Sequence, residues 1–225
     1  MARIVSLQVG KPQTQINEKG TSWTSAIAKS SVSGPIQLRR ENLDGDVQAN
    51  RKYHGGPDKA ICVYASEHYA LWRTEFARPE MPFGSFGENL TLEGLTEESI
   101  CIGDIYTVPS GATIQVCQPR VPCANVRHNW SAPKLPARMK ETGYTGFYVR
   151  VLVEGTLSEG DTLTRTERPC PEWNLLRVNN ALYGKKSEAR NAERVALCLL
   201  PPLSRDCVRH VRRLLSWEKV RLSSE

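Results

Sequence analysis

The strongest constraint on the fold is a change of pattern at Arg168-Pro169-Cys170-Pro171, which divides the chain into two unlike parts. Before it, short β-branched runs alternate with Gly, Pro, Asn and Asp, which is typical of a β-barrel or sandwich and disfavours a parallel βαβ fold. After it, apolar residues recur at helical spacing. The sequence therefore predicts a mainly β fold with some helix over residues 1–167 and a small all-α domain over residues 168–225.

The expected elements follow from these patterns. A helix is predicted after Ser66-Glu67, where an apolar stripe ends at Arg78-Pro79, and a weaker one over 133–141 is stopped by Gly143. The predicted strands cover 4–9, 26–32, 36–38, 60–64, 105–108, 113–117 and 147–153. The predicted tail helices cover 172–183, 187–199 and 204–215, with breaks at Gly184 and Pro201-Pro202.

Positive charge is concentrated in the predicted helical tail. Residues 168–225 hold 12 Lys and Arg against 6 Asp and Glu, whereas the remaining 167 residues hold 18 of each, so the tail carries the whole net charge of +6. A basic face of this kind attracts nucleic acid, an anionic membrane or an acidic protein. The alternative is a solvated helical surface without a partner.

Cysteine usage points to a reducing compartment. The seven cysteines are scattered and show no C-x-x-C pair of the kind that binds zinc or cycles as a disulfide. The N-terminus lacks a signal-peptide pattern, and no run of about 18 apolar residues exists. We therefore expect a cytoplasmic protein with no membrane association, large enough to fold without disulfides.

A polar segment at residues 45–60, GDVQANRKYHGGPDKA, is the first candidate for a binding loop. It concentrates Asp46, Lys52, His54 and Asp58 around the pair Gly55-Gly56, whose backbone amides can approach an anion closely. The alternative is a glycine turn carrying a surface histidine. A P-loop is excluded because the G-x-x-x-x-G-K-[ST] pattern is absent.

Two further segments carry polar residues that local structure explains poorly. In residues 83–90, FGSFGENL, a hairpin accounts for the glycines but not for Glu88-Asn89. In residues 118–126, QPRVPCANV, prolines stiffen a loop that holds Arg120 and Cys123 at the end of a predicted strand. A thiol beside a guanidinium favours the thiolate, so Cys123 is a candidate metal ligand or nucleophile, with a simple filler role as the alternative.

Several of these segments together resemble one family. HGGPDKA after Gly45-Asp46, GSFGENL, Ile102-Gly103-Asp104, QPRVPC and Thr145-Gly146-Phe147 occur in the order found in MOSC domains, named after the C-terminal part of molybdenum-cofactor sulfurase. The resemblance covers roughly residues 20 to 165. The helical tail is similar to the one that follows the barrel in the YiiM-like bacterial members.

The resemblance implies a β-barrel that binds the molybdenum cofactor, with Cys123 as a thiolate ligand to molybdenum. It makes Lys52, Gly55, Gly56, Asn89 and Arg120 candidate cofactor contacts, and His54 a candidate catalytic residue. Similar proteins reduce N-hydroxylated compounds, including N-hydroxylated purine bases. The chain departs from the family pattern at Asn50, where an acidic residue is expected, and at Ala124-Asn125, which replaces a bulkier pair.

The resemblance also implies a separate flavoprotein-type electron donor, because the sequence contains neither a cysteine cluster for iron–sulfur nor a G-x-G-x-x-G motif. The tail arginines Arg205, Arg209, Arg212 and Arg213 are expected to dock this acidic donor, unless the tail only caps the barrel or forms a homodimer. A second function, that of a sulfur carrier or cofactor-handling protein using Cys123, stays open. A nucleic-acid binder is disfavoured because the tail lacks interleaved aromatic residues.

Overall fold

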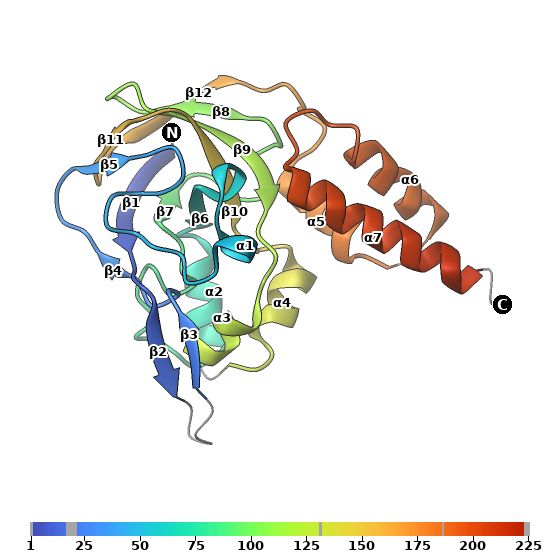
Figure 1. Ribbon diagram of the computed structural model, residues 1–225, viewed down its shortest axis with the longest axis horizontal. Coiled ribbons are helices and arrows are strands. Elements are labelled where there is room, and N and C mark those ends of the chain that lie inside the picture. The colour runs from blue at the N-terminus through green and yellow to red at the C-terminus, as the bar shows by residue number, and fades with distance from the viewer. Residues whose placement is uncertain (1, 17–21, 131, 186, 223–225) are drawn as a thin grey trace.

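The computed structural model describes residues 2–16, 22–130, 132–185 and 187–222, and its centre is a closed β-barrel (Figure 1). Strands neighbour one another in the order β12-β8-β9-β10-β6-β7-β1, and β12 pairs with β1 to close the barrel. The β6–β7 pair is parallel and the other pairs of this ring are antiparallel. The seven strands are β1 Ala2–Val9, β6 Ile61–Ala65, β7 Leu90–Glu93, β8 Ile105–Thr107, β9 Thr113–Pro119, β10 Phe147–Val153 and β12 Thr162–Glu167.

Shorter elements surround the barrel. β4 (Ser30–Ser31) extends the sheet beside β1, β5 (Ile36–Leu38) pairs with β11 (Gly155–Leu157), and β2 (Gln13–Ile16) pairs with β3 (Ser22–Ser25). The helices of this part are α1 Arg51–His54, η1 Pro57–Lys59, α2 His68–Glu75, α3 Ala124–Asn129 and α4 Leu135–Thr142. Aromatic and apolar side chains of α2, α3 and α4 form a second cluster around Trp72 and Phe86.

The central strands of the barrel have almost continuously apolar sequences because both of their faces are buried. Every residue of β6, whose sequence is ICVYA, is buried, as expected for a strand covered on both faces. In β10 the pairs Phe147–Val63 and Val149–Ile61 hold the register against β6. Because these side chains are fully buried, the ends of β6, β9 and β10 are fixed in position, and the loops that leave those ends start from a rigid frame.

The helical tail consists of α5 (Leu175–Tyr183), α6 (Glu188–Leu197) and α7 (Arg205–Leu222), which lie together on one side of the barrel (Figure 1). Its apolar residues belong to the same hydrophobic cluster as the barrel core. Polar contacts add to this junction: Asn179 donates to the Gly143 carbonyl at 2.7 Å, and the Ser204 amide donates to the Cys117 carbonyl at 2.9 Å. The tail is thus packed onto the barrel, and its status as a separate domain from residue 168 stays a prediction.

The predicted barrel and helical tail are confirmed, but several local predictions are wrong. The range 26–32 is not one strand, since only its Ser30–Ser31 part pairs, while Lys29 turns inward to form an ion pair with Asp46. The hairpin of β2 and β3 was missed because its exposed strands lack apolar alternation. β7, β11 and β12 and the short helices α1 and α3 were missed as well.

Candidate functional site

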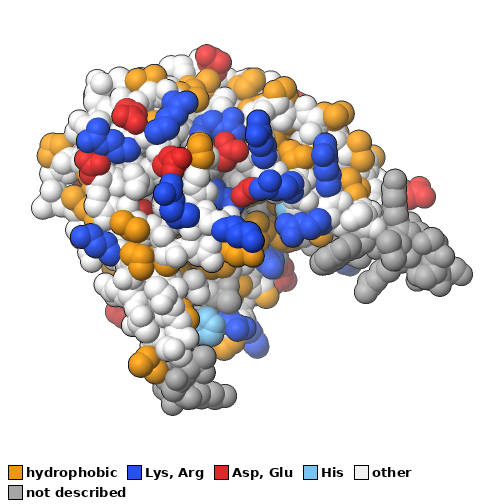
Figure 2. All heavy atoms as spheres, in the orientation of Figure 1, with side chains coloured by type: hydrophobic (Ala, Val, Ile, Leu, Met, Phe, Trp, Pro, Cys, Tyr) orange, Lys and Arg blue, Asp and Glu red, His pale blue; other side chains and the backbone are white. Residues whose placement is uncertain are grey.

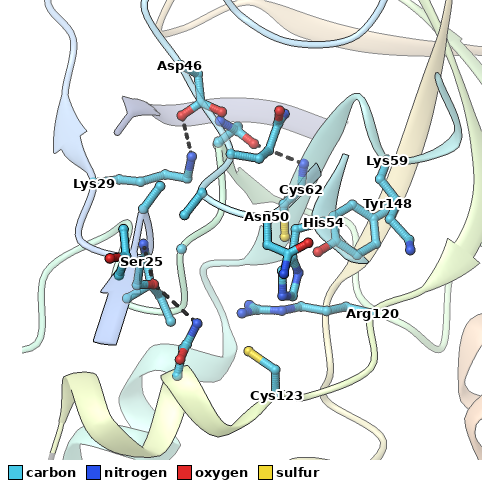
Figure 3. Close-up of a pocket in the computed structure, with 18 residues that line it drawn as sticks. Ser25, Lys29, Asp46, Asn50, His54, Lys59, Cys62, Arg120, Cys123 and Tyr148 are labelled. Atoms are coloured by element: carbon cyan, nitrogen blue, oxygen red, sulfur yellow. Dashed lines mark hydrogen bonds and ion pairs between the residues drawn. The ribbon is translucent and has the colours of Figure 1, made fainter. Parts of the chain in front are cut away.

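A polar cavity of about 200 Å³ lies where the loop before β7 and the loops after β3, β5 and β9 meet α1, the N-terminal end of β6 and the side of β10 (Figure 3). It is lined by four of the residues predicted from the sequence, namely His54, Asn89, Arg120 and Cys123. The first and last of these residues, His54 of α1 and Cys123 of the loop after β9, are 69 positions apart in the sequence. The fold therefore brings the polar segment at 45–60 and the proline-bounded loop to one place.

Cys123 is positioned by the stiff loop predicted from its flanking prolines. β9 ends at Pro119, and Cys123 is the N-cap residue of α3 with extended backbone angles. Its side chain is partly exposed and faces the cavity (Figure 3). No hydrogen bond to this sulfur is found within the described part of the chain. The thiol is therefore available to a bound group.

Arg120 provides a buried positive charge beside this thiol. The residue is 5% exposed, and its guanidinium lies between His54 and Cys123 (Figure 3). Burial opposes the charge, but interactions with Cys62, Tyr148 and Cys123 outweigh burial and raise the pKa of Arg120, so it remains protonated. Its Nη1 atom is buried without a hydrogen-bond partner among the described residues. A buried donor is normally paired, so this atom marks the place of an anionic or polar ligand.

His54 lies at the end of α1, on the wall of the same cavity. Burial, followed by the charges of Arg120 and Lys59, lowers the pKa of His54 from 6.5 to about 4. The ring is consequently neutral at neutral pH and offers one donor nitrogen and one acceptor nitrogen. The ring can hydrogen-bond to a ligand or relay a proton, but it does not carry an extra proton at neutral pH.

Several cavity residues were not identified as site residues from the sequence, among them Lys29, Cys62 and Tyr148. Lys29 forms an almost fully buried ion pair with Asp46, which also accepts a hydrogen bond from the Gly10 amide at 2.8 Å. Cys62 and Tyr148 form the opposite wall, and burial raises the pKa of the Cys62 thiol to about 11. Cys62 is buried, yet it also lines the cavity.

Asn89 lines the cavity but its side chain already serves the fold. Its Oδ1 accepts from the Cys62 amide at 3.1 Å and its Nδ2 donates to the Gln8 carbonyl at 3.3 Å. The neighbouring Glu88 is fully buried and lies outside the cavity lining. Asn89 therefore fixes two strands beside the cavity, and its role as a cofactor contact stays a prediction.

The remaining predicted residues lie at the edge of the site. Lys52 is exposed, with its Nζ 5.7 Å from the centre of the Tyr53 ring, and it lines an outer groove instead of the inner cavity. The Gly55 amide donates to the Arg51 carbonyl at 3.0 Å, and Gly56 adopts a φ of +93°. Neither glycine is among the residues that line the cavity, so their cofactor contacts stay predictions.

The donor set limits which metal groups the cavity could hold. Within the described ranges, no group of three or more His, Cys, Asp or Glu is arranged to bind a metal ion. A metal at Cys123 would therefore have to bring most of its ligands with it, as a metal in an organic cofactor does. In the described part of the chain, no helix combines the length and apolar character needed to cross a bilayer.

Comparison with known proteins gives consistent matches. The profile of the MOSC domain matches residues 50–164. Uncharacterized protein YflK of Bacillus subtilis is 44% identical over 165 residues, which cover 73% of each chain. A protein of Gibberella moniliformis named "Reductase" is 35% identical over 185 residues, which are 80% of this chain but 32% of that protein. The crystal structure of YiiM from Geobacillus stearothermophilus superimposes with a TM-score of 0.78 at 34% identity, over 96% of this chain and 100% of that one.

Proposed function

This chain belongs to the MOSC domain family, and on that premise we propose that it binds the molybdenum cofactor and reduces N-hydroxylated compounds to amines. N-hydroxylated purine bases are the substrates we would test first. The observation that carries the proposal is the pairing of a free thiol, Cys123, with a buried guanidinium, Arg120, whose Nη1 has no partner among the described residues. A relative named "Reductase" supports the reaction type.

The cavity residues fit this cofactor. A thiolate suits a soft metal centre, so Cys123 would be the protein ligand to molybdenum. The unpaired Nη1 of Arg120 would bind an anionic group, and the amides of Asn50 and Asn125 on the cavity wall would meet the polar edge of a pterin. The absence of a protein-only metal site among the described residues agrees with a cofactor that supplies its own ligands.

The reaction converts R–NH–OH, two electrons and two protons into R–NH₂ and water. When bound, the molybdenum cofactor supplies the two-electron redox chemistry that cleaves the N–O bond. His54, neutral at neutral pH, would hydrogen-bond to the hydroxylamine and relay a proton drawn from solvent. Arg120 would keep the anionic cofactor oriented and add positive charge where the substrate oxygen leaves.

The electrons would come from a separate flavoprotein-type donor. This sequence has no G-x-G-x-x-G motif for a flavin or nicotinamide, and the described residues include no metal cluster site that could relay electrons. An artificial donor can replace such a protein, because reduced viologens transfer electrons without specific docking.

The test is metal analysis of the purified protein, followed by reduction of an N-hydroxylated purine with dithionite-reduced viologen. We expect about one molybdenum per chain and turnover that disappears when the cofactor is removed. Molybdenum-loaded protein that leaves N-hydroxylated purines intact would refute the proposed reaction. In that case, a mass increase of one sulfur atom on Cys123 would favour the sulfur-carrier function.

A further inference from the structure

A second concave surface adjoins the cavity and lies between α1 and α7. It is a groove of about 900 Å³, within the range of small-molecule sites. Its walls carry Lys52 and Tyr53 of α1, Lys59 of η1, and Arg209, Arg212 and Arg213 of α7. We refer to it as the α1–α7 groove. Figure 2 shows Lys and Arg side chains gathered over the part of this face where α1 and the first turns of α7 lie.

The α1–α7 groove leads to the same thiol as the inner cavity. Four residues line both spaces, namely His54, Lys59, Cys123 and Tyr148. If the cofactor fills the inner cavity, a substrate can reach the Cys123 side of it from the groove. The groove is therefore placed to bind the part of a substrate that does not react.

The charges of this groove are unbalanced. Among the described residues that line the groove, Asp206 is the one carboxylate, and it already pairs with Lys59 at 2.6 Å and with Arg209. Lys52, Arg212 and Arg213 have no carboxylate partner in the described ranges, and all three are exposed. Burial, together with Arg213, Lys140 and Arg194, also lowers the pKa of His210 on the groove wall, which agrees with a positive field there.

The groove also offers apolar contact area. Tyr53 is 61% exposed and Val121 is 43% exposed, and both belong to its lining. An exposed tyrosine ring beside cations that have no carboxylate partner among the described residues suits a ligand that combines a flat ring or sugar with an anionic group. A concave site of this size fits such a molecule better than it fits a second protein, which would need about 800 Å² of matching surface.

We propose that the substrate is an N-hydroxylated nucleotide whose phosphate binds Arg212 and Arg213 in the α1–α7 groove while its base reaches Cys123. This inference rests on the proposed function and adds a phosphate-binding subsite to it. Lys52 would contribute a further charge from the facing helix. The free base would still react, since it keeps the inner contacts, but it would bind less tightly.

The first test measures binding without turnover. Adenosine and adenosine 5′-monophosphate, neither of which can be reduced, are titrated into the purified full-length protein by calorimetry. We expect the nucleotide to bind at least about tenfold more tightly than the nucleoside, and the difference to shrink as salt rises. The double variant Arg212→Ala/Arg213→Ala should abolish the preference. Arg205→Ala is the matched control, since Arg205 lies on the same helix but does not line the groove.

The second test measures kinetics with reduced viologen, so that no donor protein is involved. The double variant should raise KM for N-hydroxylated adenosine monophosphate at least about tenfold, with a much smaller change for the N-hydroxylated base. Equal affinity for nucleoside and nucleotide would overturn the subsite whether or not the reductase activity holds. A preserved nucleotide preference without any turnover would instead overturn the proposed reaction. Variants that slow only turnover driven by a flavoprotein would assign the groove to the donor and contradict the subsite.

Discussion

The two polar loops that end in Glu88-Asn89 and in Arg120 to Cys123 look alike in the sequence but differ in how their polar atoms are used. Glu88 accepts hydrogen bonds from the Tyr69 hydroxyl and from the amides of Gly84 and Phe86. Asn89 bonds across two strands. By contrast, Arg120 leaves Nη1 unpaired among the described residues, and the Cys123 thiol has no hydrogen bond there.

This difference separates residues that hold the fold from residues that can hold a ligand. A buried polar group whose bonds all end within the protein contributes to stability, and removing it leaves its partners unpaired. A buried cation without a carboxylate partner costs stability, so its presence indicates a ligand that compensates. Mutations in the Glu88-Asn89 loop should therefore lower the free energy of unfolding. Mutations in the Arg120–Cys123 loop should instead lower cofactor content and activity.

The largest effect is expected for Cys123→Ser. A neutral hydroxyl is a poor ligand for a soft metal, so turnover should fall by more than about a hundredfold, beyond the loss typical of residues that only orient a ligand. The unfolding free energy should stay within about 0.5 kcal/mol of the wild type, because the side chain makes no hydrogen bond to a described residue. Cys198→Ser, a partly exposed cysteine in the tail, is the control. Full turnover with normal molybdenum content in the Cys123→Ser protein would show that Cys123 is not a ligand to molybdenum.

The opposite result is expected for Glu88→Ala. Removing the carboxylate leaves at least three buried donors unpaired, which should lower the unfolding free energy by at least about 3 kcal/mol in urea titrations. Glu98→Ala, an exposed glutamate nearby in the sequence, should change it by less than about 0.5 kcal/mol. A Glu88→Ala protein of wild-type stability would contradict the structural role assigned to this loop.

Arg120→Met tests the ligand-binding side of the comparison. Methionine keeps much of the volume but removes an uncompensated buried charge, so the cofactor-free protein should be as stable as the wild type or more stable. Molybdenum retention after dialysis should fall, because the charge-assisted contact that is lost is worth roughly 1.5 to 3 kcal/mol. The same substitution at Arg138, which pairs with Glu75 and does not line the cavity, serves as a control for molybdenum retention. Lower stability with unchanged molybdenum content would reverse the interpretation of Arg120.

Local sequence patterns predicted the barrel and the loop that carries Arg120 and Cys123. They did not show which polar residues form hydrogen bonds or ion pairs inside the fold. The strand at 147–153 was predicted with the bounds it has, because its β-branched and aromatic residues are buried in the core. The proline-bounded loop was identified because prolines restrict the backbone locally. Lys29 was missed because its partner Asp46 lies 17 residues away, and nothing in the intervening sequence signals a buried ion pair.

The same limit explains the interpretation of Asn89. Its hydrogen bonds reach the Cys62 amide and the Gln8 carbonyl, which are 27 and 81 residues away in the chain. A sequence motif shows that an amide side chain is present, but only the strand arrangement shows that this amide is already bonded. The distinction between the two loops is therefore a property of the tertiary structure.

His54 should reveal its burial, and the positive charges beside it, through the pH dependence of stability. Its folded pKa of about 4 lies below the ordinary 6.5, so between these values the unfolded chain binds a proton that the folded protein does not. Stability should therefore fall as pH drops from 7.5 to 5, by about 2 kcal/mol from this group. In urea titrations at pH 7.5 and 5, His54→Gln should lose less stability than the wild type. An equal loss in both proteins would contradict the neutral His54.

The smallest effect is expected for Asp206→Asn, which tests a polar residue that joins the two parts of the molecule. Asp206 of α7 pairs with Lys59 beside the cavity at 2.6 Å, and this contact lowers the pKa of Asp206 below its ordinary value of 3.8. A carboxyl group whose pKa is lowered on folding stabilises the protein at pH values above 3.8, and this contribution disappears as pH falls through the folded pKa.

At pH 7 the Asp206→Asn substitution should lower the free energy of unfolding by about 1 kcal/mol, as for other partly exposed pairs, and molybdenum content should not change. In urea titrations the difference from the wild type should shrink as pH falls below 3.8. A loss of molybdenum at unchanged stability would place Asp206 with the ligand-binding residues instead of with those that hold the fold.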